Sequence, residues 1–303
     1  MTRLTLALAF VIAATTTSDV HDLRERHHLR REMQLLDCNR TRRSVRNCLL
    51  PLLMAVFALS SVSWATAKET PTVVDLELVV AVDVSSSMDQ DELRVQREGY
   101  ALALRSPEVM QAIKSGRWGR IAFIYFEWAN PDYQLVRVPW TVIDGPDDTA
   151  EIANAIEKQP IISQGGTSIS AALSLAGKLL RTSGLQSDRR IIDVSGDGPN
   201  NSGPSITPIR DALVAQGTTI NGLAISLSIS NPPNMTPSYD LRTLKTYYEH
   251  CVIGGFGAFV HTICNPADFE RAICQKFVDE IAGLSALFQL VSNESLDLTP
   301  ADC

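Results

Sequence analysis

Three short segments of the chain carry side-chain oxygens that can bind a metal ion. The stretch from Asp83 to Ser87 supplies one carboxylate and hydroxyls at alternate positions. Thr167 follows a Gly-Gly pair, and Asp197 lies in a Ser-Gly-Asp-Gly turn. Hard oxygen donors of this kind suit Mg²⁺, Mn²⁺ or Ca²⁺ and not Zn²⁺. The pattern predicts one divalent-cation site, formed by Asp83, Ser85, Ser87, Thr167 and Asp197.

The elements that must position these residues alternate between strands and helices. Apolar runs rich in Val, Leu and Ile predict buried strands, and apolar residues at helical spacing predict the helices between them. The expected strands are residues 73–84, 121–126, 133–138, 190–195, 219–226 and 257–262. The expected helices are residues 89–105, 147–158, 167–180, 206–216, 241–248 and 266–290.

This alternation predicts an α/β fold. Strands that alternate with helices imply crossover connections and a sheet covered on both faces. We therefore expect three layers: a doubly wound, mostly parallel, Rossmann-like sheet between two layers of helices, with residues 133–138 at an edge. Such sheets bind ligands at the carboxyl ends of their strands. Asp83 and Asp197 each end an expected strand, and Thr167 begins an expected helix, which places all three at one rim.

The first 67 residues differ from the rest of the chain. They contain nine Arg, no Lys and five acidic residues. A basic stretch at 40–47 precedes an apolar run at 48–60, and Ala65-Thr66-Ala67 follows. This order is typical of a secretory signal peptide. We predict an N-terminal extension and signal peptide over 1–67, with the true start at Met33 and cleavage after Ala67. The alternatives are an uncleaved signal anchor and export by the twin-arginine route.

Residues 68–303 are then one acidic domain. From Lys68 onward 18 basic and 29 acidic residues remain. A negative surface argues against binding to nucleic acid or to an anionic membrane, and it tolerates cations and basic partners. We predict a periplasmic or secreted protein with no stable membrane insertion after the signal is removed. The sequence does not indicate an oligomeric state.

Cysteine usage agrees with export. Four cysteines lie beyond the predicted cleavage point: Cys251, Cys264, Cys274 and Cys303. They allow three pairings, among which the sequence does not choose. An oxidising compartment favours at least one disulfide, and unpaired buried cysteines are the alternative. No C-x-x-C pair is present beyond the cleavage point, which argues against a metal site built from these residues.

The five candidate ligands resemble a known site. Asp83-x-Ser85-x-Ser87, then Thr167, then Asp197-Gly198, is similar to the metal-ion-dependent adhesion site of von Willebrand factor A domains. One departure is Gly196, which stands where that family typically has Thr. The resemblance extends over about 73–291 and looks closest to a bacterial family of exported proteins called domain of unknown function 1194.

The resemblance implies roles for these residues. Ser85, Ser87 and Thr167 would be hydroxyl ligands, and Asp83 and Asp197 would act directly or through water. A Glu or Asp from a protein partner would complete the coordination shell. Related domains couple the metal loops to movement of the last helix, here 266–290. A disulfide between Cys251 and Cys274, inferred from proximity in such a fold, would pin that helix.

We predict binding and no catalysis. Ser85 stands where an aspartyl-phosphate phosphatase would need a second Asp. The sequence has no G-x-S-x-G elbow, Walker loop or G-x-G-x-x-G. The prediction is an exported domain that grips an acidic group of an unidentified protein through a bound cation, Mg²⁺ or else Mn²⁺ or Ca²⁺. The alternatives are a metal-dependent hydrolase or phosphatase, and a structural envelope protein with a vestigial site.

Several polar residues near these segments are predicted to be structural. Asp89 with Glu92 has the spacing of a helix cap. Ser168 is interpreted as a structural neighbour of the site. Tyr247 and Tyr248 are interpreted as packing residues at a helix end.

Overall fold

The computed structural model describes residues 71–227 and 239–283. The predicted N-terminal extension and signal peptide over 1–67 lie outside the described residues. So do Cys303 and residues 284–290 of the expected last helix. Within the described ranges, no helix is long and apolar enough to span a membrane.

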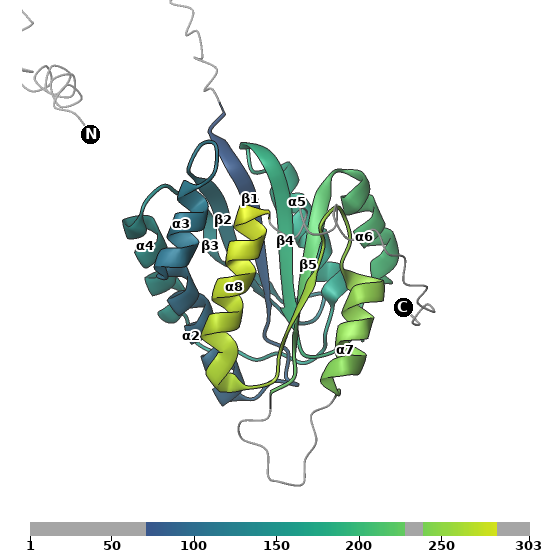
Figure 1. Cartoon of the computed structure of the whole chain (residues 1–303). Coiled ribbons are helices and arrows are strands. Elements are labelled where there is room, and N and C mark those ends of the chain that lie inside the picture. Colours follow the sequence, from purple (N-terminus) through teal and green to yellow (C-terminus); the bar gives the residue numbers. More distant parts are fainter. Residues whose placement is uncertain (1–70, 228–238, 284–303) are drawn as a thin grey trace, which may run out of the picture. The chain divides into compact units, whose positions relative to one another are not determined.

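One six-stranded sheet forms the centre of the domain (Figure 1). Its strands are β1 (Val73–Asp83), β2 (Ile121–Trp128), β3 (Gln134–Ile143), β4 (Gln186–Gly196), β5 (Thr218–Ile225) and β6 (Val260–Ile263). The strand order is β3-β2-β1-β4-β5-β6. Every neighbouring pair is parallel except β2 and β3, which are antiparallel. The order reverses direction at β1, as in a doubly wound sheet.

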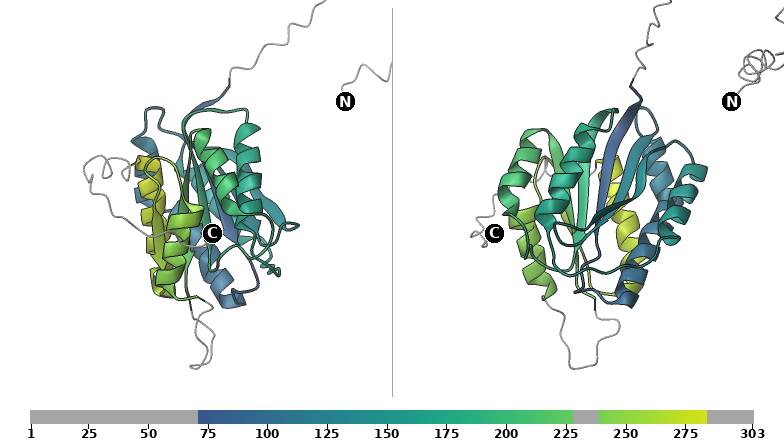
Figure 2. Two further views of the ribbon diagram at one scale, coloured as in Figure 1. Left: turned by 90° about the vertical axis from the view of Figure 1, so that its right-hand side faces the viewer. Right: turned by 180° about the vertical axis from the view of Figure 1, so that it is seen from behind.

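Helices cover both faces of the sheet (Figure 2). Side chains of α2 (Gln90–Leu104), α3 (Pro107–Lys114), α4 (Pro146–Glu157) and α8 (Phe269–Ala282) share one core with Leu76, Leu78 and Val80 of β1. Side chains of α5 (Ile169–Arg181), α6 (Ile206–Ala215) and α7 (Leu241–Tyr247) share a second core with Val79 and Ala81. Successive β1 residues thus enter opposite cores, as the two-residue period of a strand requires. The predicted three-layer α/β fold is confirmed.

The structure differs from the expected elements in several places. Helix α3 was not expected; Ser106 caps it by accepting a hydrogen bond from the backbone N of Val109 at 3.2 Å. Strand β3 continues beyond the expected end through Pro139, which an edge strand tolerates. A π-helical turn, Tyr248–Val252, follows α7.

The expected last helix, 266–290, was wrong at its end. It consists of a 3-10 turn at Pro266–Asp268 and then α8, which ends at Ala282. Gly283 follows with φ of 69°, a left-handed conformation that commonly terminates helices at glycine. The expected cap of α2 is confirmed: Asp89 and Glu92 form a reciprocal capping box.

The expected disulfide between Cys251 and Cys274 was also wrong. Cys274 is free, and its Sγ lies 3.2 Å from Oγ of Ser106. Cys251 is buried in the core on the α5–α7 face, whereas Cys274 packs against the core on the α8 face. The sheet therefore lies between the two sulfurs.

Candidate metal centre

Asp83 is the last residue of β1, at the carboxyl rim of the sheet. The register that pairs Ala81 with Val194 of β4 brings Asp83 level with Gly196. The side chain is fully buried. Its Oδ1 accepts a hydrogen bond from the backbone N of Ser85 at 2.7 Å, while Oδ2 is buried without a hydrogen-bond partner.

Ser85 and Ser87 connect this aspartate to the next strand. The two Oγ atoms lie 2.9 Å apart, and Ser87 Oγ donates to Oδ1 of Asp197 at 2.7 Å. Asp197 directly follows the last residue of β4. Four of the five predicted ligands are therefore linked by hydrogen bonds across two strands that are more than 100 residues apart in sequence.

Thr167 reaches the same place because the loop before it pairs with the loop after β1. The backbone N of Ser86 donates to Gln164 O at 2.8 Å, and Gln164 N donates to Val84 O at 3.1 Å. Gly166 then takes φ of 89°, a conformation that side chains with a Cβ rarely adopt. This turn delivers Thr167 beside the serines.

A cavity of about 320 Å³ opens between these loops. It is lined by Ser85, Ser86, Ser87, Gly166, Thr167, Gly198, Pro199, Asn201 and Tyr239. Three of the five predicted ligands thus face one cavity, and Asp197 is hydrogen-bonded to one of them, Ser87.

Neither carboxylate of this site has a basic partner among the described residues. Burial, and secondarily the charge of Asp197, raises the pKa of Asp83 well above its ordinary value. Burial also raises the pKa of Asp197. In the part of the chain that the structure describes, no Lys or Arg forms an ion pair with either residue. The donor set, one fully buried carboxylate, one half-buried carboxylate and three hydroxyls, fits a hard divalent cation.

The site does not have the composition of a zinc or polycarboxylate site. Among the described residues, no group of three or more His, Cys, Asp or Glu side chains could hold an ion. Hydroxyl oxygens must therefore supply most of any protein ligand set here.

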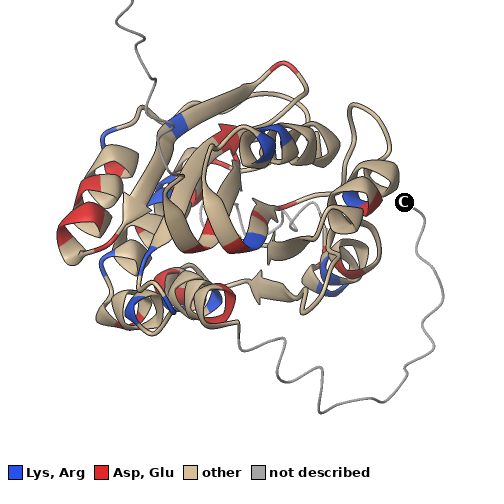
Figure 3. Ribbon diagram, turned by 90° about the horizontal axis from the view of Figure 1, so that it is seen from above, with Lys and Arg blue, Asp and Glu red and all other residues tan. Residues whose placement is uncertain are grey.

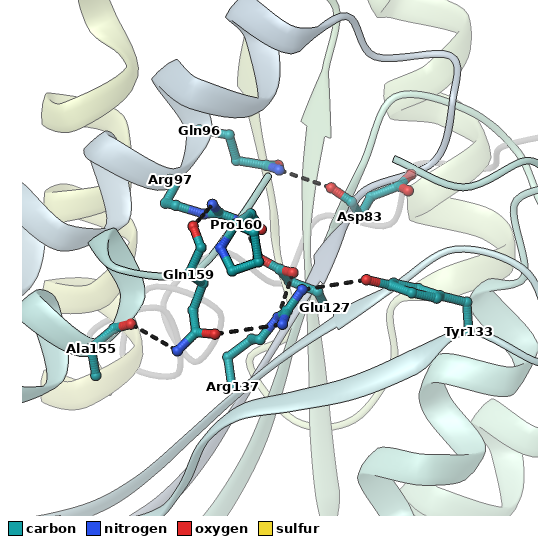
Figure 4. A network of polar contacts seen from close by, with 9 residues as sticks. All are labelled: Asp83, Gln96, Arg97, Glu127, Tyr133, Arg137, Ala155, Gln159 and Pro160. Carbon is teal, nitrogen blue, oxygen red and sulfur yellow. Dashed lines mark hydrogen bonds and ion pairs between the residues drawn. The ribbon is translucent and has the colours of Figure 1, made fainter. Parts of the chain in front are cut away.

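A network of polar residues that was not predicted from the sequence contacts Asp83 from the side of α2 (Figure 4). Gln96 of α2 donates from Nε2 to the backbone O of Asp83 at 2.8 Å. The next residue, Arg97, donates to Gln159 O at 2.6 Å and to Glu127 of β2 at 2.5 Å. The signal for these residues is a run of polar side chains on the buried face of α2.

Glu127 and two asparagines complete this support. Arg137 Nε of β3 donates to Glu127 at 2.7 Å, so two arginines neutralise that buried carboxylate. Asn201 Oδ1 accepts from Thr167 N at 2.8 Å. Asn200 N donates to Tyr247 Oη at 3.0 Å, so Tyr247 does more than pack.

Comparison with solved structures finds similar folds. A von Willebrand factor type A protein from Catenulispora acidiphila is 15% identical, with a TM-score of 0.49 over 70% of this chain and 43% of that one. The open pilus adhesin SpaC from Lactobacillus rhamnosus GG is 15% identical, with a TM-score of 0.48 over 69% of this chain and 30% of that one. Proximal thread matrix protein 1 of the mussel byssus, solved with a zinc-occupied MIDAS motif, is 15% identical, with a TM-score of 0.45 over 70% of this chain and 46% of that one.

The chain spans less than half the length of each of these three solved chains. At such identities and TM-scores the likeness carries no argument about function. No curated protein matches the chain by sequence. A family model matches residues 72–285, which is most of the chain. The chain therefore belongs to the family described as protein of unknown function DUF1194.

Proposed function

We propose that this protein is an exported binding domain that grips an acidic group of a protein partner through a divalent cation. Asp83, Ser85, Ser87, Thr167 and Asp197 hold the cation. One observation carries the proposal: the carboxylate of Asp83 is fully buried and that of Asp197 is half-buried, and no basic side chain forms an ion pair with either in the described structure. Buried charge is stable only when it is compensated, and a bound cation supplies that compensation.

The composition of the site favours binding over catalysis. Neutral hydroxyls with only two carboxylates leave a divalent ion with unsatisfied positive charge. Mg²⁺ prefers six oxygen ligands and commonly keeps waters that another ligand can replace. The 320 Å³ cavity gives a partner side chain access to Ser85, Ser87 and Thr167. A Glu or Asp carboxylate from the partner would complete the shell.

Export is part of the same proposal. The basic stretch, apolar run and Ala65-Thr66-Ala67 support cleavage after Ala67 and a periplasmic or secreted location. That compartment contains free Mg²⁺ and Ca²⁺, and it allows a disulfide among the remaining cysteines.

Metal binding is tested by titration calorimetry with Mg²⁺, Mn²⁺ and Ca²⁺ on the purified protein. We expect one site in the wild type and no measurable binding in Ser85→Ala. Ser174→Ala is the control, since Ser174 is an exposed serine of α5 whose Oγ donates to Ser170 O and does not line the cavity. Absence of any divalent-cation response in the folded wild type would contradict the proposal.

Partner binding is tested by capture from the exported protein fraction in Mg²⁺ and in EDTA. The proposal expects a partner that is retained in Mg²⁺, released by EDTA and not captured by Thr167→Ala. Capture that survives both changes would instead support a structural protein with a vestigial site. Turnover of chromogenic phosphates or esters that Asp83→Ala abolishes would support the hydrolase alternative.

A further inference from the structure

Tyr248 is a buried tyrosine whose hydroxyl lacks a partner. It is the first residue of the π-helical turn, in which Ile253 N donates to Tyr248 O at 3.0 Å. The side chain is fully buried in the core on the α5–α7 face, and its Oη has no hydrogen-bond partner. Buried phenol hydroxyls usually have one, so the position of this oxygen requires an explanation.

Two glycines form the slot in which the ring lies. A Cβ added to Gly222 of β5 would stand 2.6 Å from Cδ1 of Tyr248, and one added to Gly196 of β4 would stand 2.7 Å from its Oη. Gly222 pairs with Val194 and Gly196 pairs with Ala224, so both glycines belong to the same face of neighbouring strands. Neither has a positive φ. Space for the tyrosine, and not backbone conformation, is the reason for glycine at both positions.

The slot directs the hydroxyl toward the candidate metal centre. The same Cβ added to Gly196 would stand 2.8 Å from Oδ2 of Asp83. Tyr248 Oη and Asp83 Oδ2 therefore face the same small space above Gly196. Both atoms are buried and neither has a hydrogen-bond partner.

We propose that Tyr248 is a positioning residue of the cation site: its hydroxyl donates a hydrogen bond to Oδ2 of Asp83, directly or through one water, when the site binds its ion. This inference rests on the proposed function, because the hydrogen bond would orient a ligand of the proposed ion.

The hydrogen bond would fix the orientation of Asp83. Ser85 N already holds Oδ1 from one side. A donor on Oδ2 holds the carboxylate from the other side, so that it meets the ion without rotating. Partners that orient a metal ligand in this way strengthen metal affinity.

The test compares Tyr248→Phe with Tyr100→Phe by calorimetric titration of Mg²⁺ into the purified protein. Tyr100 is the matched control because it is also a fully buried tyrosine with an unpartnered hydroxyl, but it lies in the core on the α8 face. We expect Kd to rise on the order of tenfold in Tyr248→Phe, the effect of losing one hydrogen bond to a charged group. Kd should not change in Tyr100→Phe.

Two further readouts separate positioning from packing. Tyr248→Phe keeps the ring, so its melting temperature without metal should match that of the wild type. Mg²⁺ should also perturb the ultraviolet difference spectrum of tyrosine, and this change should be lost in Tyr248→Phe and retained in Tyr100→Phe. If Tyr248→Phe has a lower melting temperature than the wild type, the Mg²⁺-dependent tyrosine spectra of the wild type and of Tyr100→Phe are used to decide whether Tyr248 contacts the site.

The proposal and the metal site can fail separately. A wild type that binds no divalent cation overturns the proposed function. A wild type that binds Mg²⁺ with an unchanged tyrosine spectrum, or with the same affinity as a folded Tyr248→Phe variant, overturns only the role of Tyr248.

Discussion

Two aspartates four residues apart, Asp193 within strand β4 and Asp197 just beyond its end, have different surroundings. Asp193 lies in the middle of the strand, fully buried, and Lys276 Nζ of α8 is 2.6 Å from its Oδ1. The same lysine contacts Glu280, which is also buried. Asp197 lies just beyond the strand end, beside Ser87 and the cavity at the rim. Lysine neutralises the first aspartate, whereas only hydroxyl and backbone groups contact the second.

The difference shows where the chain itself compensates buried charge. Charged residues of both signs lie on the helices around the sheet (Figure 3), but those inside the fold require a partner. Asp193 and Glu280 share Lys276, and Glu127 has Arg97 and Arg137. At the rim, hydroxyl and backbone groups take the place of a basic partner. The rim opens to a cavity beside Ser85 and Ser87, whereas Asp193 is covered by α8.

The largest expected effect is the loss of the internal cation. Lys276→Met should lower the free energy of unfolding by about 3–5 kcal/mol, because Asp193 and Glu280 then remain buried without a counter-charge. Denaturant unfolding measures this loss. Lys245→Met is the control: Lys245 is exposed and paired with Glu249, so it should change stability by less than about 1 kcal/mol. If the two substitutions lowered the free energy of unfolding equally, Lys276 would not be compensating buried charge at Asp193 and Glu280.

Removing a charge at the rim should not destabilise the metal-free protein, in contrast to Lys276→Met. Mg²⁺ at 100 times its Kd should stabilise the wild type by about 2.7 kcal/mol. Asp83→Asn should abolish that response and should leave the metal-free protein at least as stable as the wild type, because repulsion with Asp197 is removed and the acceptor for Ser85 N is retained. Thermal melts with and without Mg²⁺ measure both effects. Asp75→Asn, on the same strand, should keep the Mg²⁺ response; losing it would argue against a site at Asp83.

The internal cluster should give stability a pH dependence. Burial raises the pKa of Glu280 from 4.5 to about 7, and the charge of Asp193 adds to the rise. The folded state therefore binds a proton more tightly than the unfolded state. This contribution is fully present below pH 4.5 and is lost as the pH rises through about 7.

Glu280→Gln isolates this contribution. The difference in unfolding free energy between wild type and variant should change by up to about 3 kcal/mol across that window, to the disadvantage of the wild type at higher pH. Burial lowers the pKa of His261, which acts with the opposite sign but is common to both proteins. Parallel stability curves for the two proteins would show that Glu280 does not titrate in this range.

The smallest expected effect on Mg²⁺ binding comes from the Arg97 network next to the site. Arg97→Lys loses the forked contact with Gln159 O and Glu127, so the loop that leads to Thr167 is held less firmly. We expect Mg²⁺ affinity to fall severalfold, equivalent to about 1 kcal/mol. Arg94→Lys is the control, because Arg94 is exposed on the same helix and pairs only with Asp91 in its own helix. An unchanged Kd for Mg²⁺ in both variants would show that the Arg97 network does not influence metal binding.

Local patterns in the sequence determined the fold and the place of the site. Apolar runs and helical spacing are properties of short segments, so the strands and most helices could be predicted from residues that are close in sequence. Parallel strands that alternate with helices bring their carboxyl ends to one rim. That rule was sufficient to expect Asp83, Ser85, Ser87, Thr167 and Asp197 near one another.

Contacts between distant segments were decided only by the tertiary structure. Short-range periodicity does not specify how helices pack. Helix packing decides that Lys276 contacts Asp193 and that Gln96 contacts Asp83. It also places Cys251 and Cys274 on opposite faces of the sheet. Tyr248 is the clearest case. In the sequence it is one of two tyrosines at a helix end, and only the register of β4 with β5 places Gly196 and Gly222 on one face to form the slot for its ring.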